Sequence, residues 1–299
     1  MRRFRRILIW FVVTVGGLAA AGAIAVYALS EHKLKQTYQV PSDRVAVPAD
    51  AASVARGAHL FKAVGTCALC HAEDGGGTLY ADLGLVGVIA GSNLTRGRGG
   101  LGGSFTDADY VRAIRYGVRR DGTSLIVMPS EVFTHLSDDD LGSLIAFIRQ
   151  LPPVDRELPQ TRFGPMGRVL LALGKLNILV APKTVHDAGS AAAAAAPSVE
   201  YGRYLAQASG CHGCHGTGLS GGRVAGPPDL PLASNLTPAG LGGWTEADFV
   251  RALREGRRPD GSAINEFMPW RGYGAMTDSE LRALWLYLRS VPPRATGTR

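Results

Sequence analysis

The most reactive residues of this 299-residue chain lie in two copies of one five-residue pattern. The copies are Cys67-Ala68-Leu69-Cys70-His71 and Cys211-His212-Gly213-Cys214-His215. Two thiols one short turn apart can each form a thioether to a haem vinyl group, and the adjacent imidazole is then delivered to the iron. The sequence therefore predicts two covalently bound haem c groups, attached through Cys67 and Cys70 in one copy and through Cys211 and Cys214 in the other.

Other uses of paired cysteines fit the pattern less well. A zinc site needs further Cys or His ligands grouped nearby, and a thioredoxin-like redox pair does not require a trailing histidine. A disulfide framework is typical of short secreted domains. This chain has four cysteines and all of them lie in the two patterns, so no thiol remains for a structural bridge.

The histidine that ends each pattern, His71 or His215, is the expected proximal iron ligand. Met128 and Met268 are the candidates for the opposite ligand, because they occupy equivalent places in two similar segments and each precedes a proline. A thioether is a soft ligand that raises the reduction potential of haem iron. A lone methionine is more often a packing residue, and that interpretation is kept for Met276, which has no methionine counterpart.

The remaining histidines and the repeated arginines receive no site assignment. His59 aligns with Tyr204 and His135 has no histidine counterpart, so both are expected to be surface or packing residues. Two arginine pairs recur, and they could neutralise haem propionates or belong to a solvated basic helix face. These pairs are Arg115 with Arg254 and Arg119 with Arg258.

The two patterns belong to a longer repeated unit. Ordered matches continue along the chain: Asn93-Leu94-Thr95 with Asn235-Leu236-Thr237, residues 106–122 with 245–261, and the double prolines at 152–153 with those at 292–293. Such matches at nearly constant spacing predict a duplicated domain of about 100 residues, which is longer than a solenoid repeat.

Each copy is expected to be helical. A short helix is predicted around residues 53–64. Thr or Ser followed three residues later by an acid marks two further helix starts in each copy, at Thr106, Ser137, Thr245 and Thr277. Apolar residues at helical spacing over residues 141–148 and 281–288 predict the last helix of each copy, and the double prolines end it. The segments between helices are rich in Gly and Pro, as expected where backbone wraps a flat cofactor.

The amino terminus predicts a membrane anchor. Four arginines precede Ile7–Leu29, a run of 23 residues without charge. That run can span a hydrocarbon core of about 30 Å at about 1.5 Å per residue, and the preceding arginines predict a cytoplasmic amino end. A cleaved signal peptide is the alternative, because Ala-x-Ala patterns occur at residues 21–25. The run exceeds the usual signal core of about 7–15 residues, which favours the anchor.

Most of the net charge of +7 lies near the amino terminus, where residues 1–40 hold six Lys or Arg against one acid. The excess therefore flanks the predicted anchor, and nucleic-acid binding has no support.

The connector between the two copies contains a low-complexity stretch and an apolar stretch. Ala191–Ala196 is expected to be a low-complexity tether. Residues 163–181 are apolar but contain Arg168 and Lys175, each of which costs about 2.5–3.5 kcal/mol at mid-membrane. A helix on the membrane surface or against a partner, or an ordinary packed connector, is expected there rather than a second span.

Together these residues resemble the class I cytochrome c family, and more narrowly the membrane-associated cytochrome c subunits of bacterial alcohol, aldehyde and gluconate dehydrogenases. The resemblance covers most of residues 53–299, from the Arg56-Gly57 and Tyr201-Gly202 starts to both Met-Pro pairs and proline terminators. Those subunits typically bear three haems, whereas this chain has two attachment patterns. The fold expected is all-α, with two tandem cytochrome c domains after one transmembrane helix. The expected boundaries are an anchor at 1–30, a linker at 31–52, domain 1 at 53–153, a connector at 154–197 and domain 2 at 198–299.

The resemblance implies a membrane-anchored dihaem cytochrome c of a respiratory chain. It would pass single electrons from a dehydrogenase or quinol-oxidising complex toward a terminal oxidase, with its haem domains on the periplasmic side of a bacterial inner membrane. A fixed subunit of a dehydrogenase or oxidase complex is the first alternative. A dihaem peroxidase is the second, but it needs an iron with an open sixth position. Met128 and Met268 argue against it, and no catalytic residue is expected.

Overall fold

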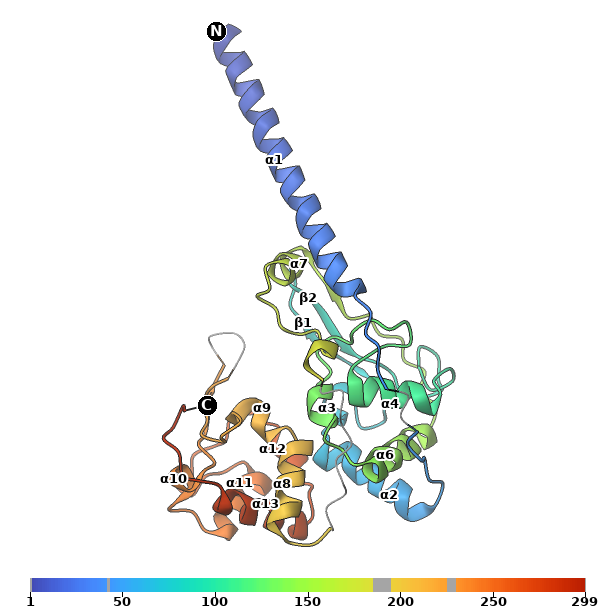
Figure 1. Ribbon diagram of the computed structural model, residues 1–299, viewed down its shortest axis with the longest axis vertical. Helices are drawn as coiled ribbons and strands as arrows, with labels where there is room; N and C mark the ends of the chain where they lie inside the picture. Colours follow the sequence, from blue (N-terminus) through green and yellow to red (C-terminus); the bar gives the residue numbers. More distant parts are fainter. Residues whose placement is uncertain (1, 42–43, 185–194, 225–229, 299) are drawn as a thin grey trace.

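The chain forms one long helix that projects from two adjoining helical modules (Figure 1). The computed structural model describes residues 2–41, 44–184, 195–224 and 230–298. Most of the predicted Ala-rich tether lies outside these described residues. The long helix α1 (Arg2–Lys35) continues beyond residue 30, where the predicted anchor ends. We refer to residues 51–151 as module 1 and to residues 199–291 as module 2.

Five helices recur in the same order in the two modules, and each module has one further helical turn without a counterpart among the described residues of the other. Module 1 contains α2 (Ala51–His59), the π-helical turn η1 (Leu60–Val64), α3 (Ala68–His71), α4 (Asp107–Tyr116), α5 (Ser130–Phe133) and α6 (Asp138–Gln150). Module 2 contains α8 (Val199–Ala208), α9 (Cys211–His215), α10 (Pro238–Leu241), α11 (Glu246–Glu255), α12 (Trp270–Tyr273) and α13 (Asp278–Ser290). The first and last helices of each module cross at a glycine. A Cβ atom at Gly57 would collide with the Ser143 carbonyl, and one at Gly202 would collide with the Ala283 carbonyl.

The predicted helix starts are confirmed. Thr106, Thr245 and Thr277 each form a complete capping box with the acid three residues later. Ser137 caps α6 by accepting from the Asp140 N–H, but the Asp140 carboxylate does not accept from the Ser137 N–H in return. The Asp140 carboxylate instead accepts from the Tyr204 hydroxyl of module 2, so this cap is the exception among the four.

The expectation of an all-α fold was too narrow. An antiparallel sheet in the order β1-β2-β3 joins β1 (Thr78–Asp82), β2 (Gly87–Gly91) and β3 (Arg162–Phe163), and β4 (Gly222–Arg223) pairs with β5 (Leu232–Ala233). Gly91 shows why strands form beside the first attachment pattern. A Cβ atom there would overlap the Cys70 carbonyl, so the strand can approach this loop only as glycine.

The connector packs against α1 and module 1. Its helix α7 (Pro165–Ala172) lies beside the lower end of α1 (Figure 1). The Lys33 ammonium donates to the Leu171 carbonyl at 2.8 Å, and Arg168 pairs with Glu31 at 2.9 Å and stacks over the Tyr27 ring. Further along, η2 (Ala181–Lys183) follows an isolated bridge between Leu179 and module 1. The structure thus favours the packed-connector alternative for residues 163–181.

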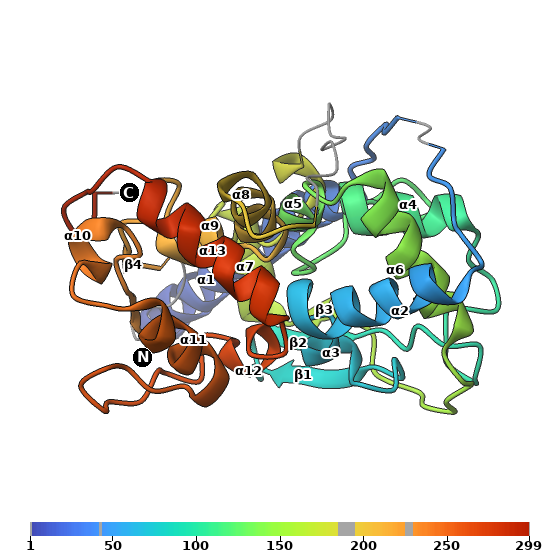
Figure 2. The same cartoon turned by 90° about the horizontal axis from the view of Figure 1, so that it is seen from below.

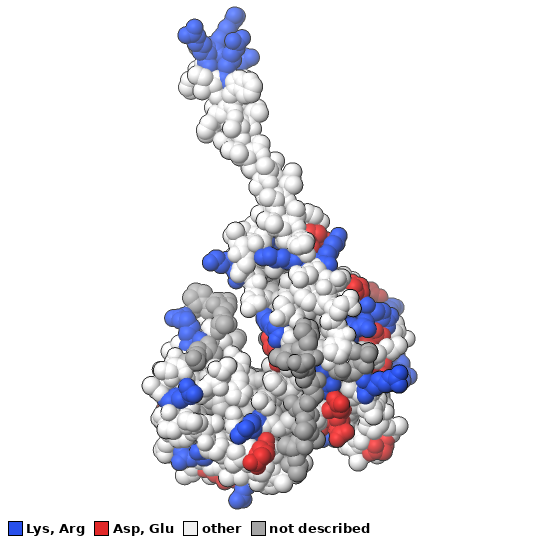
Figure 3. Space-filling model, viewed as in Figure 1, with Lys and Arg blue, Asp and Glu red and all other residues white. Residues whose placement is uncertain are grey.

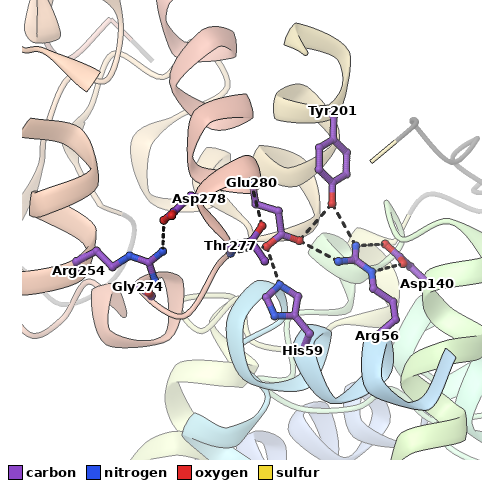
Figure 4. A network of polar contacts seen from close by, with 9 residues as sticks. All are labelled: Arg56, His59, Asp140, Tyr201, Arg254, Gly274, Thr277, Asp278 and Glu280. Carbon is purple, nitrogen blue, oxygen red and sulfur yellow. Dashed lines mark hydrogen bonds and ion pairs between the residues drawn. The ribbon is translucent and has the colours of Figure 1, made fainter. Parts of the chain in front are cut away.

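The modules meet where α2 and α8 lie beside the starts of α6 and α13 (Figures 2 and 4). The Arg56 guanidinium binds Asp140 and Glu280, both at 2.9 Å. His59 Nε2 lies 2.6 Å from Glu280 Oε2, and the Tyr204 hydroxyl donates to Asp140 at 2.6 Å. We call these residues, together with Tyr201, the intermodule clamp. His59 is therefore an interface residue rather than a general surface or packing residue.

The clamp has pseudo-two-fold symmetry. Asp140 and Glu280 occupy the same place in the repeat, as do His59 and Tyr204. His59 of module 1 contacts the acid of module 2, while Tyr204 of module 2 contacts the acid of module 1. The same two positions therefore pair in both directions, as in an isologous dimer interface.

Candidate cofactor sites

Module 2 contains a cavity that is partly open to solvent. Its wall includes Cys211, Cys214, His215 and Met268, which are the four site residues predicted for this half of the chain. Much of the remaining wall is apolar and comes from α11, α13 and the β5 region, including Leu236, Phe249, Leu253, Leu284 and Leu288. A largely apolar wall with a few polar groups at fixed places is typical of a pocket for a large flat apolar group.

The orientation of both histidines is set by a backbone carbonyl. His215 Nδ1 lies 2.7 Å from the Ser234 carbonyl oxygen, and His71 Nδ1 lies 2.8 Å from that of Ser92. Because a carbonyl can only accept, Nδ1 carries the proton and Nε2 keeps its lone pair for a metal. Burial lowers the pKa of His71 despite the Ser92 contact, which favours the neutral ring that iron requires.

The sequence did not identify Ser92 and Ser234 as site residues. The available signal was their place immediately before the repeated Asn-Leu-Thr element. In that element the Asn235 side chain accepts from the Thr237 N–H at 2.9 Å and donates to the Arg294 carbonyl at 2.8 Å. Asn93 makes the same two contacts in module 1. The element therefore ties the loop that orients the histidine to the chain beyond the double prolines.

Replacing Asn235 with Ala should destabilise module 2. The change removes the acceptor that the buried Thr237 N–H and hydroxyl share, and leaving buried polar groups unpaired costs about 1–3 kcal/mol. Urea unfolding of the purified chain, followed by circular dichroism, measures the loss. Asn177→Ala, at an exposed connector position, is the control and should change the stability by less than about 0.5 kcal/mol. Equal effects of both substitutions would contradict a positioning role for Asn235.

The two candidate methionines lie in equivalent loops. The Met128 carbonyl accepts from Ser130 N–H at 2.8 Å, and the Met268 carbonyl accepts from Trp270 N–H at 2.7 Å, so each methionine leads into a one-turn helix. Met268 lines the module 2 cavity, but so does Met276, which is 1% exposed. The structure therefore places a second thioether at this cavity, where the sequence assigned only packing.

The four thiols are free of disulfide bonds. Burial raises the pKa of Cys67 and of Cys211 to about 12, against a weaker opposing contribution from backbone hydrogen bonding. Both thiols are therefore neutral near pH 7, unlike the low-pKa thiolates of reactive cysteines. Two reduced thiols beside a neutral imidazole are the set of groups that thioether attachment of haem uses, so the residues present fit this cofactor.

The repeated arginines divide into two groups. Arg115 pairs with Asp138 at 2.8 Å, and Arg254 pairs with Asp278 at 2.7 Å and also binds the Gly274 carbonyl (Figure 4). Each of these arginines fastens α4 or α11 to the start of the last helix, so the structure gives them a tying role within the module. Arg258 instead lines the module 2 cavity, where its charge could meet an acidic group.

Two histidines without a predicted role lie at the module boundary. His135 follows α5 of module 1, and His212 lies inside the second attachment pattern. They are close enough to interact: burial lowers the pKa of His135, and the charge of His212 lowers it further. The second attachment pattern therefore faces module 1.

Comparisons with known proteins agree with this geometry. The family model described as "Cytochrome C oxidase, cbb3-type, subunit III" matches residues 52–148 and 197–288. The chain is 26% identical over 287 residues to the fructose dehydrogenase cytochrome subunit of Gluconobacter japonicus, covering 85% of this chain and 56% of that protein. It is 28% identical over 281 residues to the cytochrome c subunit of the quinone-dependent alcohol dehydrogenase of Komagataeibacter europaeus, covering 82% and 57%. A diheme cytochrome c-type protein of Cereibacter sphaeroides is 29% identical over 298 residues, covering 91% of this chain and 97% of that protein. The chain thus spans little more than half the length of the two dehydrogenase subunits.

Proposed function

Since this chain belongs to the cytochrome c family described as cytochrome c oxidase, cbb3-type, subunit III, we propose that it is a membrane-anchored dihaem cytochrome c of a respiratory chain. It is an electron-transfer protein that carries two covalently bound haem c groups. The observation that best supports the site assignment is the module 2 cavity, whose wall gathers two thiols, an imidazole and the thioethers of Met268 and Met276. We propose two tandem cytochrome c domains at 53–153 and 198–299.

The residues that hold each cofactor follow from the repeat. We assign covalent attachment to the thiol pairs of the two patterns and the proximal ligands to Nε2 of His71 and His215. Met128 and Met268 supply the opposite ligands. Each bound haem supplies one iron that exchanges a single electron. If an imidazole and a thioether both held the iron, no ligand position would remain for a substrate, which favours a carrier over a peroxidase.

The anchor supports a location at the bacterial inner membrane. Helix α1 is long and apolar enough to cross a membrane, and its uncharged stretch separates a basic tip from the charged base beside the modules (Figure 3). The basic tip predicts a cytoplasmic amino end. We propose a single pass with both modules in the periplasm. The contacts of α7 with Tyr27 and Lys33 would hold module 1 close to the membrane surface.

A dehydrogenase is the proposed electron donor, and a terminal oxidase is the proposed acceptor. The similarity to cytochrome subunits of fructose and alcohol dehydrogenases supports the donor. The same similarity favours a fixed subunit of such a complex as the second candidate. Purification from mild detergent distinguishes the two: a stable complex with a dehydrogenase indicates a fixed subunit, and release of the free cytochrome indicates a shuttle.

Counting the covalent haems tests the site assignment directly. The intact chain should carry two, and Cys67→Ala/Cys70→Ala and Cys211→Ala/Cys214→Ala should each leave one, because each pair of thiols serves one module. Mass spectrometry of the denatured protein gives the count, and each double variant is the control for the other. Two covalent haems in either double variant, or fewer than two in the intact chain, would refute the assignment.

A further inference from the structure

The two modules touch at two equivalent points, each beside an attachment pattern. A Cβ atom at Gly210 would lie 3.0 Å from Val132 Cγ2, and a Cβ atom at Gly272 would lie 2.7 Å from Thr66 Cγ2. Thr66 and Gly210 both directly precede the first cysteine of their pattern, and Val132 and Gly272 occupy equivalent places in α5 and α12. The same two positions therefore meet twice, with the modules exchanged. We call these pairs the loop contacts.

The loop contacts are complementary in volume. At each contact one partner is glycine and the other carries a side chain. Thr66 has a φ of 46°, in the left-handed region that favours glycine, whereas Gly210 occupies the equivalent position with a φ of 72°. Backbone conformation alone would therefore favour glycine at residue 66. Contact with Gly272 gives the threonine side chain a structural reason to be there, because it fills the space that the glycine leaves.

Each loop contact brings the attachment pattern of one module against the methionine-bearing loop of the other. One partner leads directly into an attachment pattern, and the other lies four residues beyond a candidate methionine ligand. The intermodule clamp holds the same interface through Arg56, Asp140 and Glu280. The attachment loop of each module is thus packed against the methionine side of the other.

We propose that the loop contacts form the route by which electrons pass between the two modules, and that Thr66 and Gly272 are positioning residues for this transfer. The proposal rests on the proposed function, since it requires a haem in each module. One electron leaves the reduced module and reduces the other, and no bond forms or breaks. Electron tunnelling slows steeply with distance, so close packing at these points controls the rate. The transfer then depends on a few atoms at the boundary.

A steric swap tests the proposal. Gly272→Val places a side chain against Thr66 and should separate the loops. Thr66→Gly/Gly272→Val recreates at this contact the pairing that Gly210 and Val132 make at the other, so it should restore the fit. In the dihaem holoprotein we expect the single variant to slow electron redistribution between the modules several-fold after rapid one-electron reduction. We expect the double variant to recover the original rate.

A magnetic readout separates spacing from other causes. Gly272→Val should weaken the spin coupling between the two oxidised iron centres in electron paramagnetic resonance, and the double variant should restore it. Gly243→Val is the control, since a Cβ atom at this position has open space, and it should change neither quantity. An unchanged transfer rate in Gly272→Val with both haems present would overturn the proposal, as would failure of the double variant to recover the rate when the coupling recovers. Fewer than two haems in the unmodified protein would instead refute the proposed function.

Discussion

Met268→Leu is expected to abolish the sulfur-to-iron absorption band of one haem and to lower the reduction potential of that haem alone. A thioether ligand raises the potential of haem iron, and leucine cannot replace it. Leucine has nearly the volume of methionine, so the packing cost should stay below about 1.5 kcal/mol. Met128→Leu should have the same effect on the other haem, and the double variant should lose the band completely. Optical redox titration of the purified protein measures both changes.

Met276→Leu is the decisive control for this prediction. Met276 lines the same cavity as Met268, but its counterpart in module 1 is Leu136, so the repeat itself shows that leucine fits this position. The band and both potentials should be unchanged. Loss of the band in Met276→Leu with retention in Met268→Leu would transfer the ligand role to Met276.

Glu280→Gln is expected to destabilise the protein by about 3 kcal/mol at pH 7, since one pKa unit corresponds to about 1.4 kcal/mol. Glu280 is 3% exposed. Burial alone would raise its pKa, but hydrogen bonds from His59, the Thr277 N–H and Arg56, with the charge of His59, outweigh burial and hold the pKa at about 2, below the ordinary value of 4.5. Glutamine preserves the shape but removes the charge that faces Arg56 and His59.

The pH dependence of this loss identifies its cause. Because the pKa of Glu280 is lower in the folded state, its stabilisation is fully present above about pH 4.5 and is lost as the pH falls toward about 2. The difference in urea midpoint between the original protein and Glu280→Gln should therefore be largest near neutral pH and shrink between pH 5 and pH 2. Glu266→Gln removes an exposed acid from its pair with Arg271 and should cost at most about 1 kcal/mol. A loss for Glu280→Gln that is independent of pH would indicate packing rather than charge.

Local sequence patterns carried most of the chemistry of this chain. The attachment pattern contains three functional residues within five positions, so its spacing alone predicts the cofactor and the proximal ligand. Helix starts are similarly local, because a cap and its acid are three residues apart. The strand pairing was missed because three of the five described strands have only two residues and β2 begins and ends with glycine. Gly91 is required by the approach of Cys70 rather than by strand propensity.

The intermodule clamp could not be predicted from the sequence. Arg56 and Glu280 are 224 residues apart, and nothing near either residue indicates that they meet. Glu280 was recognised as a capping residue, and it does cap α13, but its carboxylate also binds His59 and Arg56 of the other module. Ser92 could not be identified from the sequence either, because it orients His71 through the direction of its backbone carbonyl, which any residue type can provide.

The sequence by itself determined the cofactor class, the duplication, the long apolar amino-terminal helix and the order of the main helices, because each of these depends on residue types at short fixed spacing. Only the tertiary structure decided which nitrogen of each histidine carries the proton, how the two modules oppose each other, and why threonine occupies a left-handed position at residue 66. These features depend on contacts between segments that are remote in the chain, where close packing and hydrogen-bond direction, rather than local propensity, select the arrangement.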